Sequence, residues 1–216
     1  MRIVSILENQ KIEKRIAITP EIAKKYTALG FEISLCVNYG VHLGFKDSEY
    51  KELGVKILKD EKEIINSADV IVQLGLLPDD KISLIKKNQI LIGVLDPYRN
   101  KKKIDELVKN DINIFSLDLL PRITRAQSMD ILSSQANLAG YKAVIESFAS
   151  FKKAIPMMMT AAGTIPAAKV LVVGAGVAGL QAIATAKRMG AIVFATDVRM
   201  ASKEQVESLG GKFLTI

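Results

Sequence analysis

One stretch of the sequence, residues 169–197, constrains the fold more than any other. A short run of strand-forming residues, 169–173, apolar after Lys169, is followed at once by Gly174, Gly176 and Gly179 in the pattern Gly-x-Gly-x-x-Gly. Such a β-branched run is typical of a strand buried on both faces. The three glycines in turn allow a tight turn, let the backbone approach a pyrophosphate, and let the next helix lie close on the sheet. The stretch therefore predicts the first strand, turn and helix of a dinucleotide-binding unit.

The residues that follow complete this unit. Residues 181–189 continue the predicted helix, whose first amides and positive dipole end would face the phosphates, and Gly190 ends it. A second apolar strand, 192–196, leads into Asp197, which lies 18 residues beyond Gly179. An acid at this distance accepts hydrogen bonds from both hydroxyls of the adenosine ribose. The alternative is a glycine-rich turn that binds no ligand.

The charges at the end of the second strand bear on which dinucleotide is bound. The Asp197 carboxylate would repel a 2′-phosphate, which favours NAD over NADP. Arg199 is the residue type that commonly binds such a phosphate, so NADP stays open at this point. The predicted cofactor-binding residues are Gly174, Ala175, Gly176, Val177, Ala178, Gly179, Asp197, Val198 and Arg199.

Composition excludes several other classes. The net charge of +7 raises the question of nucleic acid, but the lysines are spread along helices, and the one tight run, 101–103, has no interleaved aromatic residues. Solvated helix faces are the better interpretation, with an acidic partner or lipid headgroups as the alternative. No run of ~20 apolar residues is present, and the N-terminus does not resemble a secretory signal. The single cysteine, Cys36, predicts a buried, inert thiol in a reducing cytoplasm. The sequence predicts no metal site.

The first 125 residues alternate between strand and helix patterns. A mainly parallel sheet covered by helices on both faces accounts for this alternation. The expected strands are 2–7, 31–37, 55–58, 69–74, 89–95 and 112–117, and the expected helices are 20–29, 47–53, 61–66, 79–87 and 100–109.

A long amphipathic helix is expected from residue 124 to residue 151, because Met129, Leu132 and Ala136 follow the 3.6-residue period. We divide the chain into an N-terminal α/β domain (1–125), a connecting helix (126–152) and an NAD-binding Rossmann domain (153–216). Residues 155–168 are expected to form a loop, with a helix at 203–209 and a strand at 212–216. Only half of a dinucleotide fold is then present. The predicted fold is α/β, with two Rossmann-like doubly wound parallel-sheet domains joined by a long helix, the second incomplete in a fragment of a longer chain.

These residues together resemble a known family. Residues 121–141, which read PRITRAQSMDILSSQANLAGY, are the most specific stretch, and residues 158–164 and the glycine-rich unit match as well. The whole chain is similar to the alanine dehydrogenase and nicotinamide nucleotide transhydrogenase family. Within that family it is most similar to the proton-translocating transhydrogenase branch.

The resemblance implies hydride transfer from NADH, bound on this chain, to NADP⁺ held on a partner domain. It also implies membrane subunits that couple the transfer to proton movement, a homodimer, and a cytoplasmic location at the periphery of the inner membrane. The motif match would place four residues around the nicotinamide: Arg122, Gln127, Asp130 and Ser133. From residue types alone, Asp130 and Ser133 could instead cap the long helix.

Two alternatives stay open. The first is an alanine dehydrogenase, and Arg15 resembles the carboxylate-binding arginine of those enzymes. However, residues 73–75 and 96–98 lack the lysine and histidine that the dehydrogenases carry there, and the only histidine, His42, lies in a different loop. That chemistry needs a general acid for the carbonyl oxygen. The second alternative is an NAD-binding module with no chemistry of its own.

Overall fold

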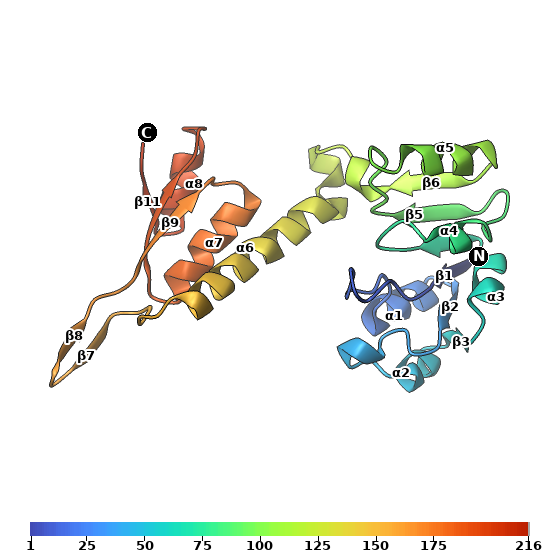
Figure 1. Ribbon diagram of the computed structural model, residues 1–216, viewed down its shortest axis with the longest axis horizontal. Coiled ribbons are helices and arrows are strands. Elements are labelled where there is room, and N and C mark those ends of the chain that lie inside the picture. Colours follow the sequence, from blue (N-terminus) through green and yellow to red (C-terminus); the bar gives the residue numbers. More distant parts are fainter. Residues whose placement is uncertain (216) are drawn as a thin grey trace. The chain divides into compact units, whose positions relative to one another are not determined.

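The protein is represented by a computed structural model, in which the structure of residues 1–215 is described. Its residues form two compact units, Met1–Met129 and Asp130–Ile216, and each is described here by itself (Figure 1). The predicted three-part division into 1–125, 126–152 and 153–216 stays a prediction.

A six-stranded sheet forms the centre of the first unit. All neighbouring strands are parallel, in the order β3-β2-β1-β4-β5-β6. The order reverses between β1 and β4, and in such sheets ligand crevices lie beyond the carboxyl ends of the strands at that point. The predicted parallel α/β architecture of this unit is confirmed. The strands are β1 (Arg2–Ser5), β2 (Glu32–Cys36), β3 (Lys56–Leu58), β4 (Val70–Val72), β5 (Ile90–Gly93) and β6 (Asn113–Ser116).

The helices of this unit begin close to the residues that the sequence indicates. In the first helix the Thr19 hydroxyl accepts a hydrogen bond from the Ile22 amide at 3.4 Å, and Pro20 occupies the first turn, where it loses no helical bond. The helices are α1 (Pro20–Ala28), α2 (Asp47–Glu52), α3 (Glu61–Asn66), α4 (Asp79–Ile82) and α5 (Lys101–Lys109), with 3₁₀ turns η1 (Val41–Leu43), η2 (Leu117–Leu119) and η3 (Thr124–Met129).

Helix α4 is shorter than the predicted 79–87. The buried Gln89 explains the difference, because its Oε1 accepts the Lys86 amide at 2.6 Å. Its Nε2 donates to the carbonyls of Ile65 and Ala68, both at 2.7 Å. A buried amide that needs these partners holds the chain away from the helical path.

Two buried tyrosines tie the loop that precedes α1 to the sheet. The rings of Tyr39 and Tyr50 meet edge to face with centroids 6.2 Å apart. The Tyr39 hydroxyl accepts the Ile18 amide at 3.2 Å and lies 2.8 Å from the Ser5 hydroxyl, while the Tyr50 hydroxyl donates to the Ile18 carbonyl. The predicted burial of Cys36 is also confirmed, and burial raises the pKa of its thiol to about 11.

The second unit packs a long helix against a smaller parallel sheet. Helix α6 lies along α7, and the sheet has the order β11-β10-β9. The buried side chains of Val144, Ile183, Val193 and Val206 form the centre of its core. The elements are α6 (Ile131–Ser150), β7 (Met158–Thr160), β8 (Gly163–Ile165), β9 (Lys169–Val173), α7 (Val177–Arg188), β10 (Ile192–Thr196), α8 (Ser202–Ser208) and β11 (Lys212–Phe213).

The loop predicted at 155–168 is wrong, because much of this segment is a β-hairpin. Strands β7 and β8 pair antiparallel, with Met158 opposite Ile165 and Thr160 opposite Gly163. The Thr160 hydroxyl closes the turn by accepting the Ala162 amide at 3.2 Å. The hairpin extends away from the three-stranded sheet of its own unit (Figure 1), and both of its strands are exposed.

The prediction that residues 169–173 are buried on both faces is also wrong. In β9, Val170 and Val172 pack on the core, whereas Leu171 and Val173 are 59% and 79% exposed. Helix α7 covers one face of the strand, and among the described residues no element covers the other face.

The long helix begins later than predicted, since residues 124–129 form the 3₁₀ turn η3 and α6 starts after Asp130. Within the described part of the chain, no helix has the combination of length and apolarity needed to cross a lipid bilayer.

Candidate functional site: a dinucleotide cradle

The turn between β9 and α7 requires two of its three glycines for its own geometry. Gly174 has φ +94°, a left-handed conformation that side chains disfavour. A Cβ on Gly179 would lie 1.8 Å from the Gly174 carbonyl oxygen, so the first turn of α7 can approach the turn this closely only with glycine there. The predicted need for glycine at both positions is confirmed, although Gly179 meets the turn backbone more closely than the sheet.

Gly176 has a different role, because a Cβ placed there would meet none of the described residues within 4 Å. It is the N-cap of α7, and no side chain among residues 1–215 caps the helix. The first amides of Val177 and Ala178 have no acceptor within the helix, because the residues needed would precede it. A bare helix N-terminus with open space before it fits a pyrophosphate, which would be held by backbone N–H groups and the helix dipole.

The end of β10 meets this turn through Asp197. Its Oδ2 accepts the Ala175 amide at 2.7 Å, and its Oδ1 accepts the Arg199 amide at 2.8 Å. The Arg199 guanidinium adds two further bonds, from Nε to Oδ1 at 3.0 Å and from Nη2 to Oδ2 at 3.1 Å. The structure therefore joins Ala175, Asp197 and Arg199, three of the predicted cofactor-binding residues.

These contacts set the ionisation of the acid. The Arg199 side chain, followed by the Arg199 and Ala175 amides, holds the pKa of the Asp197 carboxyl well below its usual range. The same pair raises the pKa of the Arg199 guanidinium. The Asp197 side chain is 6% exposed and that of Arg199 is 63% exposed, while Val198 between them is fully exposed. Asp197 is thus a charged acceptor at physiological pH.

Two of the residues predicted at the nicotinamide end form a helix cap. The Asp130 Oδ1 accepts the Ser133 amide at 2.9 Å, and the Ser133 hydroxyl donates to Asp130 Oδ2 at 2.6 Å. This is the capping arrangement that residue types alone allowed, and it fixes both side chains at the start of α6. A role at the nicotinamide stays a prediction.

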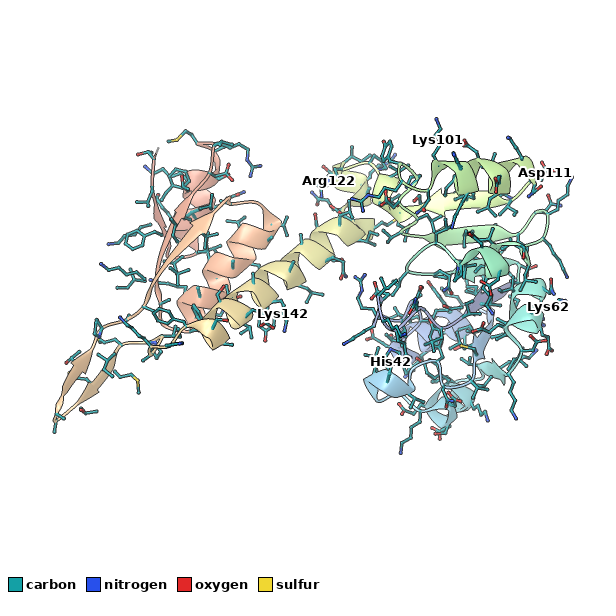
Figure 2. The ribbon with its side chains drawn as sticks, viewed as in Figure 1. His42, Lys62, Lys101, Asp111, Arg122 and Lys142 are labelled. Carbon is teal, nitrogen blue, oxygen red and sulfur yellow. The ribbon has the colours of Figure 1, made fainter. Side chains whose placement is uncertain are left out.

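The other two predicted residues lie in the segment before α6. Arg122 precedes the 3₁₀ turn η3 (Figure 2) and Gln127 lies within it, and both side chains are exposed. Ala126, which is 5% exposed, is the buried residue of this turn. Their predicted contacts with nicotinamide likewise stay a prediction.

Residues 174–179 and Asp197 together are called the cradle below. Sequence reasoning missed the contact that joins α6 to this cradle. A Cβ on Gly140 would lie 2.0 Å from the Ala178 carbonyl oxygen, in the first turn of α7. Gly140 therefore lets the two helix backbones meet beside the predicted phosphate position. An isolated glycine within a helical pattern was the available signal, since it usually has a packing reason.

In the first unit, side chains of the protein itself occupy the carboxyl ends of β1 and β4, where the strand order reverses. Glu8 Oε1 accepts the Leu74 amide at 2.6 Å and the Gln73 Nε2 at 3.1 Å. Burial raises the pKa of the Glu8 carboxyl, and the amides of Leu74 and Gly75 oppose this. Gln73, 3% exposed, also bonds the backbone of Ile6 through both ends of its amide.

Arg15 and His42 are engaged in the same region of the first unit. The Arg15 guanidinium pairs with Glu13 at 2.6 Å. The His42 Nε2 lies 2.8 Å from the Lys14 carbonyl oxygen, and its Nδ1 lies 3.1 Å from the Gln10 Nε2. A neutral His42 that donates from Nε2 and accepts at Nδ1 satisfies both contacts, which is a structural use of the ring.

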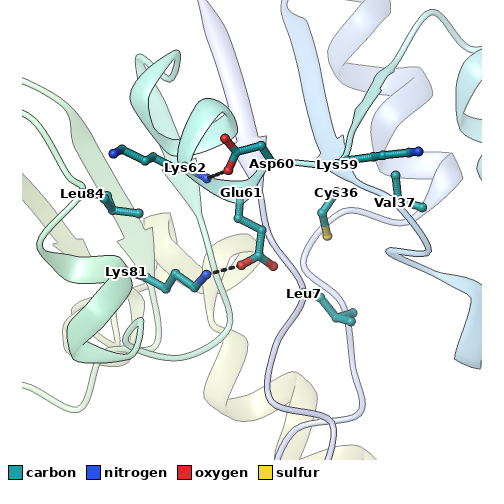
Figure 3. Close-up of a pocket in the computed structure, with 9 residues that line it drawn as sticks. All are labelled: Leu7, Cys36, Val37, Lys59, Asp60, Glu61, Lys62, Lys81 and Leu84. Carbon is teal, nitrogen blue, oxygen red and sulfur yellow. Dashed lines mark hydrogen bonds and ion pairs between the residues drawn. The ribbon is translucent and has the colours of Figure 1, made fainter.

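A cavity of about 370 Å³ lies at the carboxyl edge of this sheet (Figure 3). Glu61 and Lys81 line the cavity and form an ion pair of 2.5 Å. An anion or a cation that entered would therefore be repelled by one of these two charges and attracted by the other. Its lining residues are Leu7, Cys36, Val37, Lys59, Asp60, Glu61, Lys62, Lys81 and Leu84. Across the described residues, no three His, Cys, Asp or Glu side chains are grouped so that they could hold a metal ion.

Two family models match the chain. Residues 6–139 match "Alanine dehydrogenase/PNT, N-terminal domain", and residues 143–216 match "Alanine dehydrogenase/PNT, C-terminal domain". The chain belongs to this family. The predicted family resemblance is therefore confirmed, and the glycine-rich cradle lies within the segment matched by the C-terminal-domain model.

Relatives within the alanine dehydrogenase/PNT family favour its transhydrogenase branch. The chain is 49% identical to an NAD(P) transhydrogenase subunit alpha polypeptide of Rhodospirillum rubrum over 221 residues, which cover all of this chain and 58% of the relative. The crystal structure of transhydrogenase from Sinorhizobium meliloti matches with a TM-score of 0.92 and 46% identity, over 98% of this chain and 64% of that one. The chain thus spans less than two thirds of the length of these relatives.

An L-alanine dehydrogenase structure shares the fold at a greater distance. Its TM-score is 0.84 at 20% identity, over 99% of this chain and 60% of that one. Both similarities support the predicted fold of two Rossmann-like α/β domains, the second of them incomplete.

Proposed function

We propose that this chain is the NAD(H)-binding component of a proton-translocating transhydrogenase, in which hydride passes from NADH to NADP⁺ held on a partner domain. The observation that carries the proposal is the uncapped N-terminus of α7, which faces open space beside the ionised Asp197. Family membership and the 49% identity to a transhydrogenase subunit support the choice of reaction.

The adenosine half of NADH would be held by the second unit. The amides of Val177 and Ala178 would bind the pyrophosphate, and Asp197 would accept the ribose hydroxyls. The negative charge of Asp197 would repel the 2′-phosphate of NADPH, so NADH is the expected ligand on this chain.

Helix α6 offers a physical reason for placing the nicotinamide end near Asp130 and Ser133. Gly140 contacts the first turn of α7, and Ser133 precedes it by seven residues, which is two helical turns. Ser133 is therefore on the same face of α6 as Gly140, about 10 Å from it along the helix axis. We propose that Asp130 and Ser133, together with Arg122 and Gln127, contact the nicotinamide ribose and carboxamide.

Hydride transfer requires little of the protein beyond the placement of the nicotinamide ring. Bound NADH would supply a hydride from its dihydronicotinamide ring and leave as NAD⁺. No proton has to be moved by a side chain for this step, so the task of the four polar residues is to orient the ring and exclude water.

The residues do not favour an alanine dehydrogenase. Reduction of an imine or a keto acid needs a proton donor beside the carbonyl. Gln73 is buried and fully engaged with Ser5, Ile6 and Glu8, and His42 is held by Lys14 and Gln10. Neither side chain is arranged as a general acid.

A homodimer belongs to this proposal, with the β7–β8 hairpin as the contacting element. Met157, Met158 and Met159 are 59%, 49% and 71% exposed, and Ile165 is 51% exposed. A protruding apolar hairpin of this kind needs a covering surface, and a second copy is the proposed one. Sedimentation of Met159→Ser beside the wild type tests the dimer.

Membrane subunits and a cytoplasmic location at the inner membrane complete the proposal.

The deciding experiment mixes the full-length protein with a separately produced NADP-binding domain and follows NADH-dependent reduction of an NADP⁺ analogue. Turnover that is lost in Asp197→Asn supports the proposal. Tight NADH binding without turnover would indicate a binding module, and amination of pyruvate would indicate a dehydrogenase.

A further inference from the structure

The acceptor positions of Asp197 are fully used within the chain. An ionised carboxylate has about four lone-pair positions, two on each oxygen. On Oδ2 they are taken by the Ala175 amide and Arg199 Nη2, and on Oδ1 by the Arg199 amide and Arg199 Nε. Each oxygen therefore has one backbone donor and one guanidinium donor. No acceptor position remains for a ribose.

The two kinds of donor differ in how easily they can leave. The backbone amides belong to the β9–α7 turn and to the end of β10, so they move only with the fold. The Arg199 side chain is 63% exposed and is held by Asp197 alone among the partners that the structure gives it. A rotation of this side chain into solvent would vacate one position on each oxygen. The two hydroxyls of a ribose diol have one O–H each, which matches those two positions.

We propose that Arg199 is a specificity-determining residue whose guanidinium occupies the ribose-diol positions of Asp197 until the adenosine ribose displaces it. This inference rests on the proposed binding of NAD(H). It reverses the usual expectation for such an arginine, since Arg199 competes with the nucleotide for Asp197 instead of adding to its affinity.

The same contact affects discrimination against a 2′-phosphate. While Arg199 is present, its positive charge offsets the negative charge of Asp197. The repulsion between Asp197 and the 2′-phosphate of NADPH is then weaker. Removal of Arg199 should therefore tighten NADH binding and weaken NADPH binding. A residue that only stabilised the loop would change both affinities in the same direction.

The test measures dissociation constants for NADH, NADPH, ADP and 2′,3′-dideoxy-ADP by calorimetry on the full-length protein. Arg199→Ala should bind NADH and ADP about two- to fivefold more tightly, the range expected for loss of an ion pair whose cation is exposed to solvent. It should show no gain for dideoxy-ADP, which has no hydroxyls to fill the vacated positions. Arg199→Lys, a single point donor, should give a smaller gain.

Lys203→Ala is the matched control, because it removes a half-exposed cation from nearby α8 whose closest carboxylate partner, Glu207, is 4.0 Å away. It should leave the affinities for NADH and ADP unchanged. An equal gain in Lys203→Ala, an equal gain for dideoxy-ADP, or weaker NADH binding in Arg199→Ala would overturn the inference while leaving NAD binding intact. Failure of the wild-type protein to bind NADH and ADP would instead reject the proposed function together with this inference.

Discussion

Gly140 of α6 lies against the carbonyl oxygen of Ala178 in the first turn of α7, so closely that a Cβ on residue 140 would be 2.0 Å from that oxygen. The clash is with backbone, which cannot rotate away as a side chain can. The contact couples the longest helix of the second unit to the turn that forms the predicted phosphate site.

Gly140→Ala should therefore destabilise the second unit. Forcing one methyl group into a packed helix contact costs about 1–3 kcal/mol. The expected result is a lower denaturant midpoint together with weaker NADH binding, measured by urea unfolding and by titration. Ala139→Gly, at an exposed neighbouring position, is the control for helix propensity. Unchanged stability in Gly140→Ala would mean that the two helices are less closely packed than described.

Gly176→Ala should separate folding from binding. The Cβ would meet none of the described residues within 4 Å, and the φ of −78° suits alanine, so the unfolding free energy should change by less than about 0.5 kcal/mol. NADH affinity should fall by about tenfold or more, because the methyl group would occupy the position proposed for the pyrophosphate. Wild-type affinity in a folded Gly176→Ala protein would argue against the cradle.

Substitutions at Asp130 can separate its capping role from its proposed role at the nicotinamide. Asp130→Ala removes the acceptor for the Ser133 amide and should cost about 0.5–2 kcal/mol of stability. Asp130→Asn keeps an acceptor and should lose much less. If Asp130 also orients the nicotinamide, Asp130→Asn should slow hydride transfer in spite of its stability. Ser134→Ala, which removes only the bond to the Ile131 carbonyl, is the control. Normal transfer in Asp130→Asn would leave the residue with the cap alone.

Glu8 should make the first unit less stable as the pH rises from acidic to neutral. Burial raises the pKa of this carboxyl above the ordinary value of 4.5, so above that pH the unfolded chain releases the proton more readily than the folded chain. Below pH 4.5 both states are protonated and the effect vanishes. Glu8→Gln keeps an oxygen for the Leu74 amide, so it should gain stability relative to wild type between pH 4 and pH 7 in urea titrations.

Glu21→Gln is the control of opposite sign for this prediction. The exposed Glu21 has its pKa lowered by Lys25, so its charge favours the folded state above pH 4.5. Removing that charge should give a relative loss of stability on going from pH 4 to pH 7. Parallel pH dependence in Glu8→Gln and Glu21→Gln would contradict the assignment of burial as the dominant influence on Glu8.

The cradle could be predicted from sequence because its components are local. Gly174, Gly179 and Asp197 belong to a single strand–turn–helix–strand unit, in which Gly174 has the positive φ of the tight turn and Gly179 allows the close backbone approach. The contact of Asp197 with a ribose stays a prediction. The alternation of the first 125 residues likewise determines a parallel sheet. The ends of α1 could be placed closely, with Thr19 as its cap and Pro20 in its first turn, whereas the start of α6 was predicted too early although Asp130 caps that helix.

The features that were missed depend on contacts between distant elements. The role of Gly140 depends on where α6 meets α7, which no periodicity reveals. The β7–β8 hairpin turns at Ala161 and Ala162, which lack the Asn-Gly type of signal that marks a two-residue turn. Burial of Leu171 and Val173 was overestimated, since an apolar strand is buried only if an element covers each face.

The uncovered face of β9 affects how this polypeptide will behave in concentrated solution. At low ionic strength, the net charge of +7 keeps copies apart by mutual repulsion. Added salt screens that repulsion, and sulfate additionally strengthens association between apolar surfaces such as those of Leu171 and Val173. Solubility should therefore fall steeply with salt, and salting out at unusually low ammonium sulfate is the expected sign of the bare strand.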